Sequence, residues 1–160
     1  MAAASGVGAN PQMWLLCRAG TRLCALAITH VVETMRMPPL EPFLEAPDFI
    51  AGLAVVHGDA VPVIATAQLL GGEKEDHPQR LVTIDVGSGR LVALAVTEVI
   101  GVHAIASELQ RELPTLLRDA AHEAVQALQV RDNELMLFLN GGKLIPESLL
   151  DRLDAQKLQT

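Results

Sequence analysis

Apolar residues along the chain form short runs, and residues typical of turns lie between these runs. One run covers residues 50–56, the turn residues 57–59 follow, and a second run covers residues 60–64. This pattern predicts two strands joined by a tight turn. Pro62 lies inside the second run, and because proline lacks the N–H of a ladder bond, the sequence favours an edge strand or a β-bulge there. An exposed strand edge is a surface on which a partner protein can dock.

Pairs of apolar runs separated by turn residues predict three further hairpins. Two of these hairpins are followed by a longer strand. This loose echo between the two halves of the chain fits two pseudo-equivalent small barrels. Glycine-containing or polar turns divide each hairpin. The hairpins are expected at residues 13–19 with 22–28, 80–86 with 90–96, and 124–130 with 135–139, and the longer strands at 31–35 and 99–105.

Helices are predicted to be few. Residues 66–70 favour a short helix that Gly71 and Gly72 end. Apolar positions at helical spacing over residues 143–158 predict an amphipathic helix that closes the domain. Single helical turns are expected at residues 46–49 and after Pro114. Many short strands with so few helices exclude a βαβ architecture and favour a mainly β barrel or sandwich.

Composition and charge argue against two classes of protein, those that bind nucleic acid and those that span a membrane. The 160 residues are 50% hydrophobic, enough for one domain or two small lobes that share a core. The formal net charge of −7 and an aromatic content of 2% argue against binding to nucleic acid. The longest nearly apolar stretch, residues 91–106, contains Glu98 and His103 and is too short to span a bilayer. Residues 1–12 are expected to be a disordered lead-in, not a secretory signal.

Candidate chemistry is sparse. Cys17 and Cys24 flank a predicted turn and could pair, but small apolar fillers in a reducing cytoplasm are the simpler interpretation. No spacing of ligand residues predicts a metal site, and no motif predicts a cofactor. The loop that begins at Asp85 faintly resembles the Asp-Thr-Gly-Ser loop of aspartic proteases, which would require a dimer. A hairpin turn explains the same residues more simply.

Four segments together resemble the CheW-like adaptor family of bacterial chemosensory arrays, over roughly residues 13–152. The most specific part is the spacing from Gly52 through Gly58 to the Val-Pro-Val-Ile run at residues 61–64. Residues 153–160 would form a tail or helix end. The four segments are LCALAITHVVET (23–34), PDFIAGLAVVHGDAVPVIATAQLLG (47–71), RLVTIDVGSGRLVALAVTEVIGV (80–102) and LMLFLNGGKLI (135–145).

The resemblance implies two SH3-like five-stranded barrels packed around a shared core, with short helices and a C-terminal helix. It implies a cytoplasmic, non-enzymatic adaptor, monomeric alone, that couples the cytoplasmic domain of a chemoreceptor to the regulatory domain of a CheA-type histidine kinase. The groove between the barrels would receive the receptor helix, and an edge of the first barrel would pack on the kinase. The resemblance places the partner-binding residues on the groove side, where His57 would be a polar anchor for the receptor helix. These residues are Val31, Glu33, Val55, Val56, His57, Gly58 and Ala60.

Several charged positions of the family pattern are changed in this chain. His57 stands for the turn arginine and Val55 for the turn asparagine, while residues 65–67 are Ala-Thr-Ala in place of Asp-Leu-Arg, and Thr97 replaces an aspartate. Histidine lacks the fixed, multiple donors of arginine. The sequence therefore describes a divergent adaptor.

Other interpretations stay open at this stage. His57 could be a turn residue without a partner, and Glu33 could face water through ordinary strand alternation. The chain could also be a general β-barrel interaction module, a receptor-only adaptor that has lost kinase coupling, or, most remotely, a dimeric hydrolase that uses Asp85.

Overall fold

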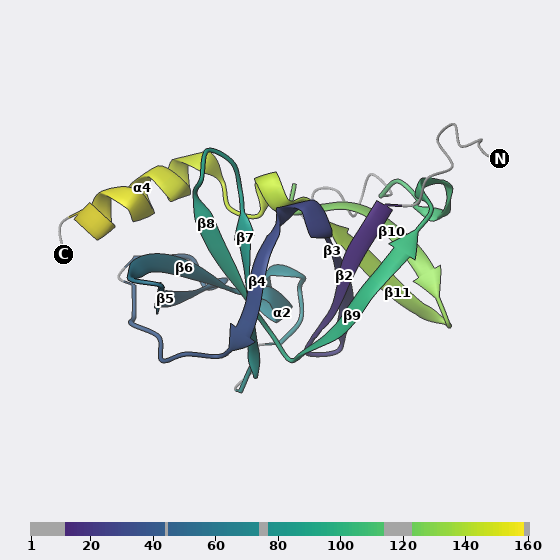
Figure 1. Cartoon of the computed structure of the whole chain (residues 1–160), viewed down its shortest axis with the longest axis horizontal. Coiled ribbons are helices and arrows are strands. Elements are labelled where there is room, and N and C mark those ends of the chain that lie inside the picture. Colours follow the sequence, from purple (N-terminus) through teal and green to yellow (C-terminus); the bar gives the residue numbers. More distant parts are fainter. Residues whose placement is uncertain (1–11, 44, 74–76, 114–122, 159–160) are drawn as a thin grey trace.

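The computed structural model describes residues 12–43, 45–73, 77–113 and 123–158, and these form ten strands in two five-stranded sheets (Figure 1). The predicted mainly β fold with two five-stranded units is confirmed. Of the predicted lead-in, Gln12 already belongs to the first strand, and residues 1–11 lie outside the described part. The helical turn expected after Pro114 falls on residues 114–122, which also lie outside it.

The terminal unit is the sheet built from the two ends of the chain. It has the order β10-β11-β3-β2-β9, in which β11 and β3 are parallel and the other neighbours are antiparallel. The strands are β2 (Gln12–Ala19), β3 (Arg22–Ala27), β9 (Glu98–Ile105), β10 (Val125–Arg131) and β11 (Glu134–Leu139).

The central unit is the second sheet and repeats this arrangement. Its order is β4-β7-β8-β6-β5, with β6 and β8 as the parallel pair. The strands are β4 (Val31–Arg36), β5 (Ile50–Val56), β6 (Asp59–Ala65), β7 (Arg80–Asp85) and β8 (Leu91–Val96).

Each half of the chain gives its third strand to the other unit. β4 follows the β2–β3 hairpin but pairs with β7, and β9 follows the β7–β8 hairpin but pairs with β2. The similarity between the two halves that the sequence predicts is therefore present, but each longer strand pairs in the other unit. In Figure 1, β4 accordingly lies beside β7 near the middle of the molecule, and β9 runs beside β2 in the terminal unit.

The buried apolar residues form three clusters, and one of them joins the two units. One lies inside the terminal unit, one lies inside the central unit, and the third is shared between them. Along β2, Trp14 and Leu16 enter the terminal cluster, whereas Leu15 and Cys17 enter the shared cluster. Because the inner strands are buried on both faces, they are continuous apolar runs without polar alternation.

The proline-rich connection between β4 and β5 is tied to the central unit. Glu41 and Leu53 exchange two backbone hydrogen bonds of 2.8 Å. Gly52 makes this approach possible, since a Cβ on it would lie 2.4 Å from the carbonyl oxygen of Glu41. The helical turn predicted at residues 46–49 is only a hydrogen-bonded turn, in which the amide of Ile50 donates to the carbonyl of Pro47.

The expectation that Pro62 marks an edge strand or bulge is wrong. β6 lies between β8 and β5, and the irregularity in this hairpin is on β5, between Ile50 and Gly52. Pro62 is tolerated because β6 pairs with β8 only from Val63 onward. Its partner Leu53 bonds through both backbone groups to Glu41, so the backbone nitrogen of Pro62 points away from β5, and no ladder bond to β5 is lost.

The two predicted helices are present, one with a different start. α2 (Thr66–Leu69) ends at a left-handed Gly71, as expected. α4 (Glu147–Leu158) begins four residues later than predicted, after Pro146 and a 3-10 turn at Gly141–Lys143. Its buried residues Leu149 and Leu150 join the shared cluster.

Candidate partner-binding surface

The polar pair Glu33–His57 joins two of the residues that the sequence assigned to partner binding. Glu33 lies on β4, and His57 lies in the β5–β6 turn. β4 and β5 are the two edge strands of the central unit, and the His57 Nε2 atom lies 2.5 Å from Glu33 Oε1. The pair therefore connects the two edges of this sheet. Sequence alone predicted each residue but not their contact.

The β5–β6 turn presents His57 to solvent. His57 and Gly58 both have positive φ angles, 49° and 86°, as the two-residue turn of a hairpin requires. The His57 side chain is 75% exposed, and that of Glu33 is 35% exposed. A polar contact this exposed stabilises the fold by at most about 1 kcal/mol. Its polar groups are thus available to a partner at little cost in stability.

The predicted site residues divide into exposed and buried ones. Val55 is 66% exposed on β5, while Gly58 faces open space and Ala60 is half-buried. Val56 is 4% exposed and packs inside the central unit, so its side chain is a core residue. Val31 is half-buried against the shared cluster. Sequence analysis missed Val32, which is 53% exposed at the irregularity in β4.

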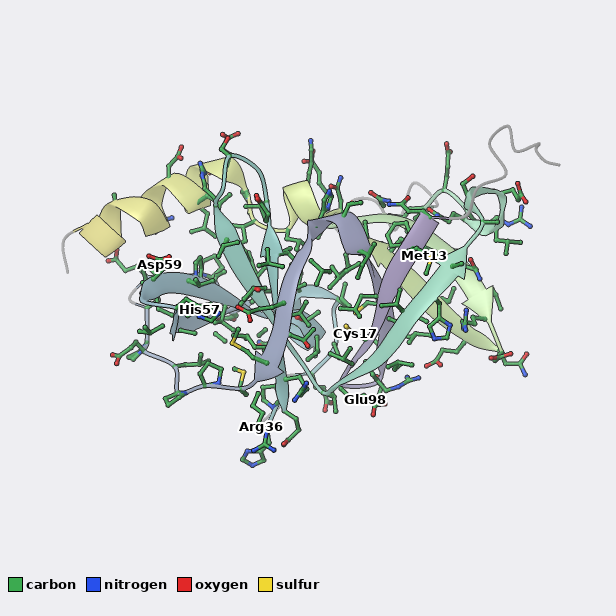
Figure 2. The ribbon with its side chains drawn as sticks, in the orientation of Figure 1. Met13, Cys17, Arg36, His57, Asp59 and Glu98 are labelled. Atoms are coloured by element: carbon green, nitrogen blue, oxygen red, sulfur yellow. The ribbon has the colours of Figure 1, made fainter. Side chains whose placement is uncertain are left out.

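A second exposed apolar surface, also missed, lies on the terminal unit. The exposed residues are Met13 of β2 and Ile100 and Val102 of β9. The strand register pairs Met13 with Ala104 and Leu15 with Val102, which places these side chains on one face. Because β9 is apolar at almost every position, its sequence does not distinguish the buried face from the exposed one. Figure 2 shows Met13 at the end of β2, far from His57.

The terminal unit has its own cross-linking polar pairs. Arg131 on β10 lies 3.1 Å from the Nδ1 atom of His103 on β9, which resembles the Glu33–His57 link in the central unit. Arg18 donates two hydrogen bonds, of 2.7 and 3.1 Å, to the carboxylate of Glu134. This hydrogen bonding lowers the pKa of Glu134 and raises that of Arg18.

The remaining candidate groups have structural roles. Cys17 and Cys24 are paired across the first hairpin, unoxidised and fully buried, and burial raises the pKa of Cys17 to about 12. Asp85 accepts a hydrogen bond of 2.8 Å from the amide of Gly87 and so orders its own turn. Among the residues that the structure describes, no cluster of histidine, cysteine and carboxylate side chains could hold a metal ion.

Two of the changed family positions are also explained. Ala67, which stands where the family pattern has arginine, is buried in α2, where a charged side chain would be costly. The hydroxyl of Thr97 accepts a 2.8 Å hydrogen bond from the amide of Gly20, and the amide of Thr97 donates to the carbonyl of Arg18. Thr97 thus anchors the strand that crosses from β8 to β9.

Comparison with known proteins decides the family. A family model described as the CheW-like domain matches residues 13–148. The chain belongs to the CheW-like family. CheW-like proteins are chemotaxis scaffolds, and the family is not one of enzymes. A search of curated protein sequences finds no match.

Solved structures show the same CheW fold. The crystal structure of the scaffolding protein TtCheW from Thermoanaerobacter tengcongensis matches with a TM-score of 0.72 and 21% sequence identity, over 85% of this chain and 88% of that one. At this identity the match concerns the fold. Within the described residues, no helix has the length and hydrophobicity needed to cross a membrane.

Proposed function

We propose that this CheW-like protein is a cytoplasmic adaptor that couples the cytoplasmic domain of a chemoreceptor to the regulatory domain of a CheA-type histidine kinase. It would be monomeric alone and assemble with its partners. The observation that carries the proposal is the Glu33–His57 pair, which lies exposed at the positions where the family resemblance assigns partner contacts.

The chemistry of this surface suits protein recognition. Val32 and Val55 supply exposed apolar area, and the polar pair supplies hydrogen-bonding groups that can fix the register of a partner. Interfaces depend on such a combination of apolar anchors and a few oriented polar groups. Val56 holds the turn in place from inside the central unit and makes no partner contact of its own in this proposal.

The second apolar surface gives the adaptor a second site. Met13, Ile100 and Val102 lie on the terminal unit, separate from the β5–β6 turn. An adaptor needs two surfaces that can be occupied together. The family resemblance gives Val31, Glu33 and the His57 turn to the groove that receives the receptor helix. We propose the opposite assignment for this chain. The turn surface would bind the kinase regulatory domain, and the β9 surface would bind the receptor helix, for which an apolar stripe is the usual complement.

Binding of each purified partner to surface variants tests the proposal. His57→Asn keeps a residue that tolerates the left-handed turn but removes the imidazole, and it should weaken kinase binding about tenfold without changing receptor binding. Val102→Ser should have the opposite effect. Isothermal titration calorimetry measures both affinities, and urea unfolding checks that each variant is folded.

Asp132→Asn is the matched control. Asp132 has a φ angle of 50° in the equivalent turn of β10–β11, so this change perturbs a turn of the same geometry on the other unit. It should leave kinase binding unchanged. If His57→Asn and Asp132→Asn have the same small effect, the turn is not the kinase surface. If the parent binds only the receptor, the chain is a receptor-only adaptor, and if it binds neither partner, the adaptor proposal is wrong.

A further inference from the structure

A cavity of about 1160 Å³ lies at the end of the central unit where β4 finishes. Its walls come from the end of β4, the start of β7, the first turn of α2 and the connections at residues 37–40 and 77–79. Figure 2 shows Arg36 at this end of β4, away from His57 and from Met13, and none of the lining residues belongs to either surface. The cavity is therefore separate from both surfaces proposed for protein partners.

Two arginines meet in the wall of this cavity. Arg36 and Arg80 are direct partners in the β4–β7 register, so their Cβ atoms are about 5 Å apart. Like charges placed opposite each other on neighbouring strands destabilise a sheet. Within the described part of the chain, neither guanidinium has a hydrogen-bonding or ion-pair partner. An anion bound between them would remove the repulsion and satisfy both groups.

The other wall residues define what kind of anion fits. Gln68, Gln79 and His77 add polar side chains, and Asp48 is the single carboxylate among the described lining residues. This local excess of positive charge contrasts with the net charge of −7 on the whole chain. Much of the remaining wall is apolar, from Met37, Leu40, Ile50 and Ala95. The cavity wall thus combines two cationic side chains with an apolar area.

We propose that this cavity binds a small organic anion, a phosphate ester or carboxylate with an apolar body. The planar guanidinium groups of Arg36 and Arg80 hold the anionic oxygens, since arginine matches such groups with paired hydrogen bonds. The apolar body lies against Met37 and Leu40. This site gives a chain of the scaffold family a small-molecule ligand in addition to its protein partners.

Titration with phenyl phosphate, followed through backbone amide NMR shifts, tests the site. Phenyl phosphate should shift the amides of Arg36, Gln68 and Arg80 and raise the thermal midpoint of the parent protein. Inorganic phosphate should bind more weakly, and phenol should not bind. Arg36→Gln and Arg80→Gln should each weaken phenyl phosphate binding about tenfold or more, as expected for loss of charged hydrogen bonds.

Arg22→Gln is the matched control, because Arg22 is exposed at the start of β3 on the other unit. It should bind phenyl phosphate as the parent does. Arg80→Gln without ligand should unfold at a higher temperature than the parent at low salt, because it removes a like-charge pair, whereas a purely structural arginine would give a loss.

Equal weakening by Arg22→Gln, or no amide shifts at millimolar phenyl phosphate, would overturn the proposal. Binding of a glutamate-rich peptide in place of phenyl phosphate would also overturn it and would make the cavity a site for an acidic segment of a protein.

Discussion

Replacing Gly52 with alanine should destabilise the protein strongly, although it adds a single methyl group. The new Cβ would lie 2.4 Å from the carbonyl oxygen of Glu41, and Gly52 has a φ angle of 151° that side chains rarely adopt. Relief of this clash requires the connection to move away from β5, which breaks the two backbone hydrogen bonds between Glu41 and Leu53.

The magnitude follows from these two effects. A residue held in such a backbone conformation costs about 1–3 kcal/mol. Two lost backbone hydrogen bonds cost about 1 kcal/mol each. The free energy of unfolding should therefore fall by about 3–5 kcal/mol. With a denaturant slope of about 2 kcal/mol per molar urea, the unfolding midpoint moves down by about 2 M.

Gly58→Ala is the control for this measurement. Gly58 also has a positive φ angle, 86°, but a Cβ on it would meet nothing within 4 Å. This variant should lose only about 1–2 kcal/mol, the cost of the left-handed backbone alone. Urea unfolding followed by far-UV circular dichroism compares the two. A loss for Gly52→Ala no larger than that for Gly58→Ala would refute the argument from close approach.

Three further predictions concern the terminal unit and the shared core. Phe138→Ala should cost about 3–5 kcal/mol in urea unfolding, because Phe138 is fully buried with its ring centroid 4.8 Å from that of Trp14; a loss below about 1 kcal/mol would mean that the cluster repacks. The lowered pKa of Glu134 makes its contact with Arg18 stabilising above the ordinary value of 4.5 and ineffective once the pH falls through the lowered pKa. The stability difference between the parent and Glu134→Gln should therefore shrink in unfolding curves recorded at decreasing pH below 4.5, and a constant difference would exclude this linkage. Cys17, whose pKa burial raises to about 12, should react with iodoacetamide at about pH 8 only as fast as the protein unfolds, and rapid labelling of the native protein would contradict this.

Local signals in the sequence identify most of the strands. The turns at Gly20, at Gly87–Gly89 and at Asp132-Asn133 separate apolar runs, and each of these hairpins is present. The exchange of β4 and β9 could not be predicted in this way. It depends on which sheet buries the outer face of each strand, a choice that involves residues far apart in the chain.

The residues of the candidate site can be named from the sequence, but their arrangement cannot. The family spacing located the turn at His57 and the acidic residue Glu33, whereas their contact arises only because the sheet brings its two edges together. Val55 and Val56 could not be assigned to exposed and buried faces, since the run from Ile50 is apolar throughout and an irregularity after Ile50 shifts its register. The pairing of Arg36 with Arg80 likewise depends on the β4–β7 register.

Sedimentation of a three-component mixture tests the central claim most directly. Receptor cytoplasmic domains assembled on vesicles, the kinase regulatory domain and this protein would be mixed and spun together. We predict that the kinase domain enters the pellet only when this protein is present, and that His57→Asn lowers the amount of kinase domain but not of adaptor. Equal amounts of sedimented kinase domain with and without the protein would contradict its role as an adaptor.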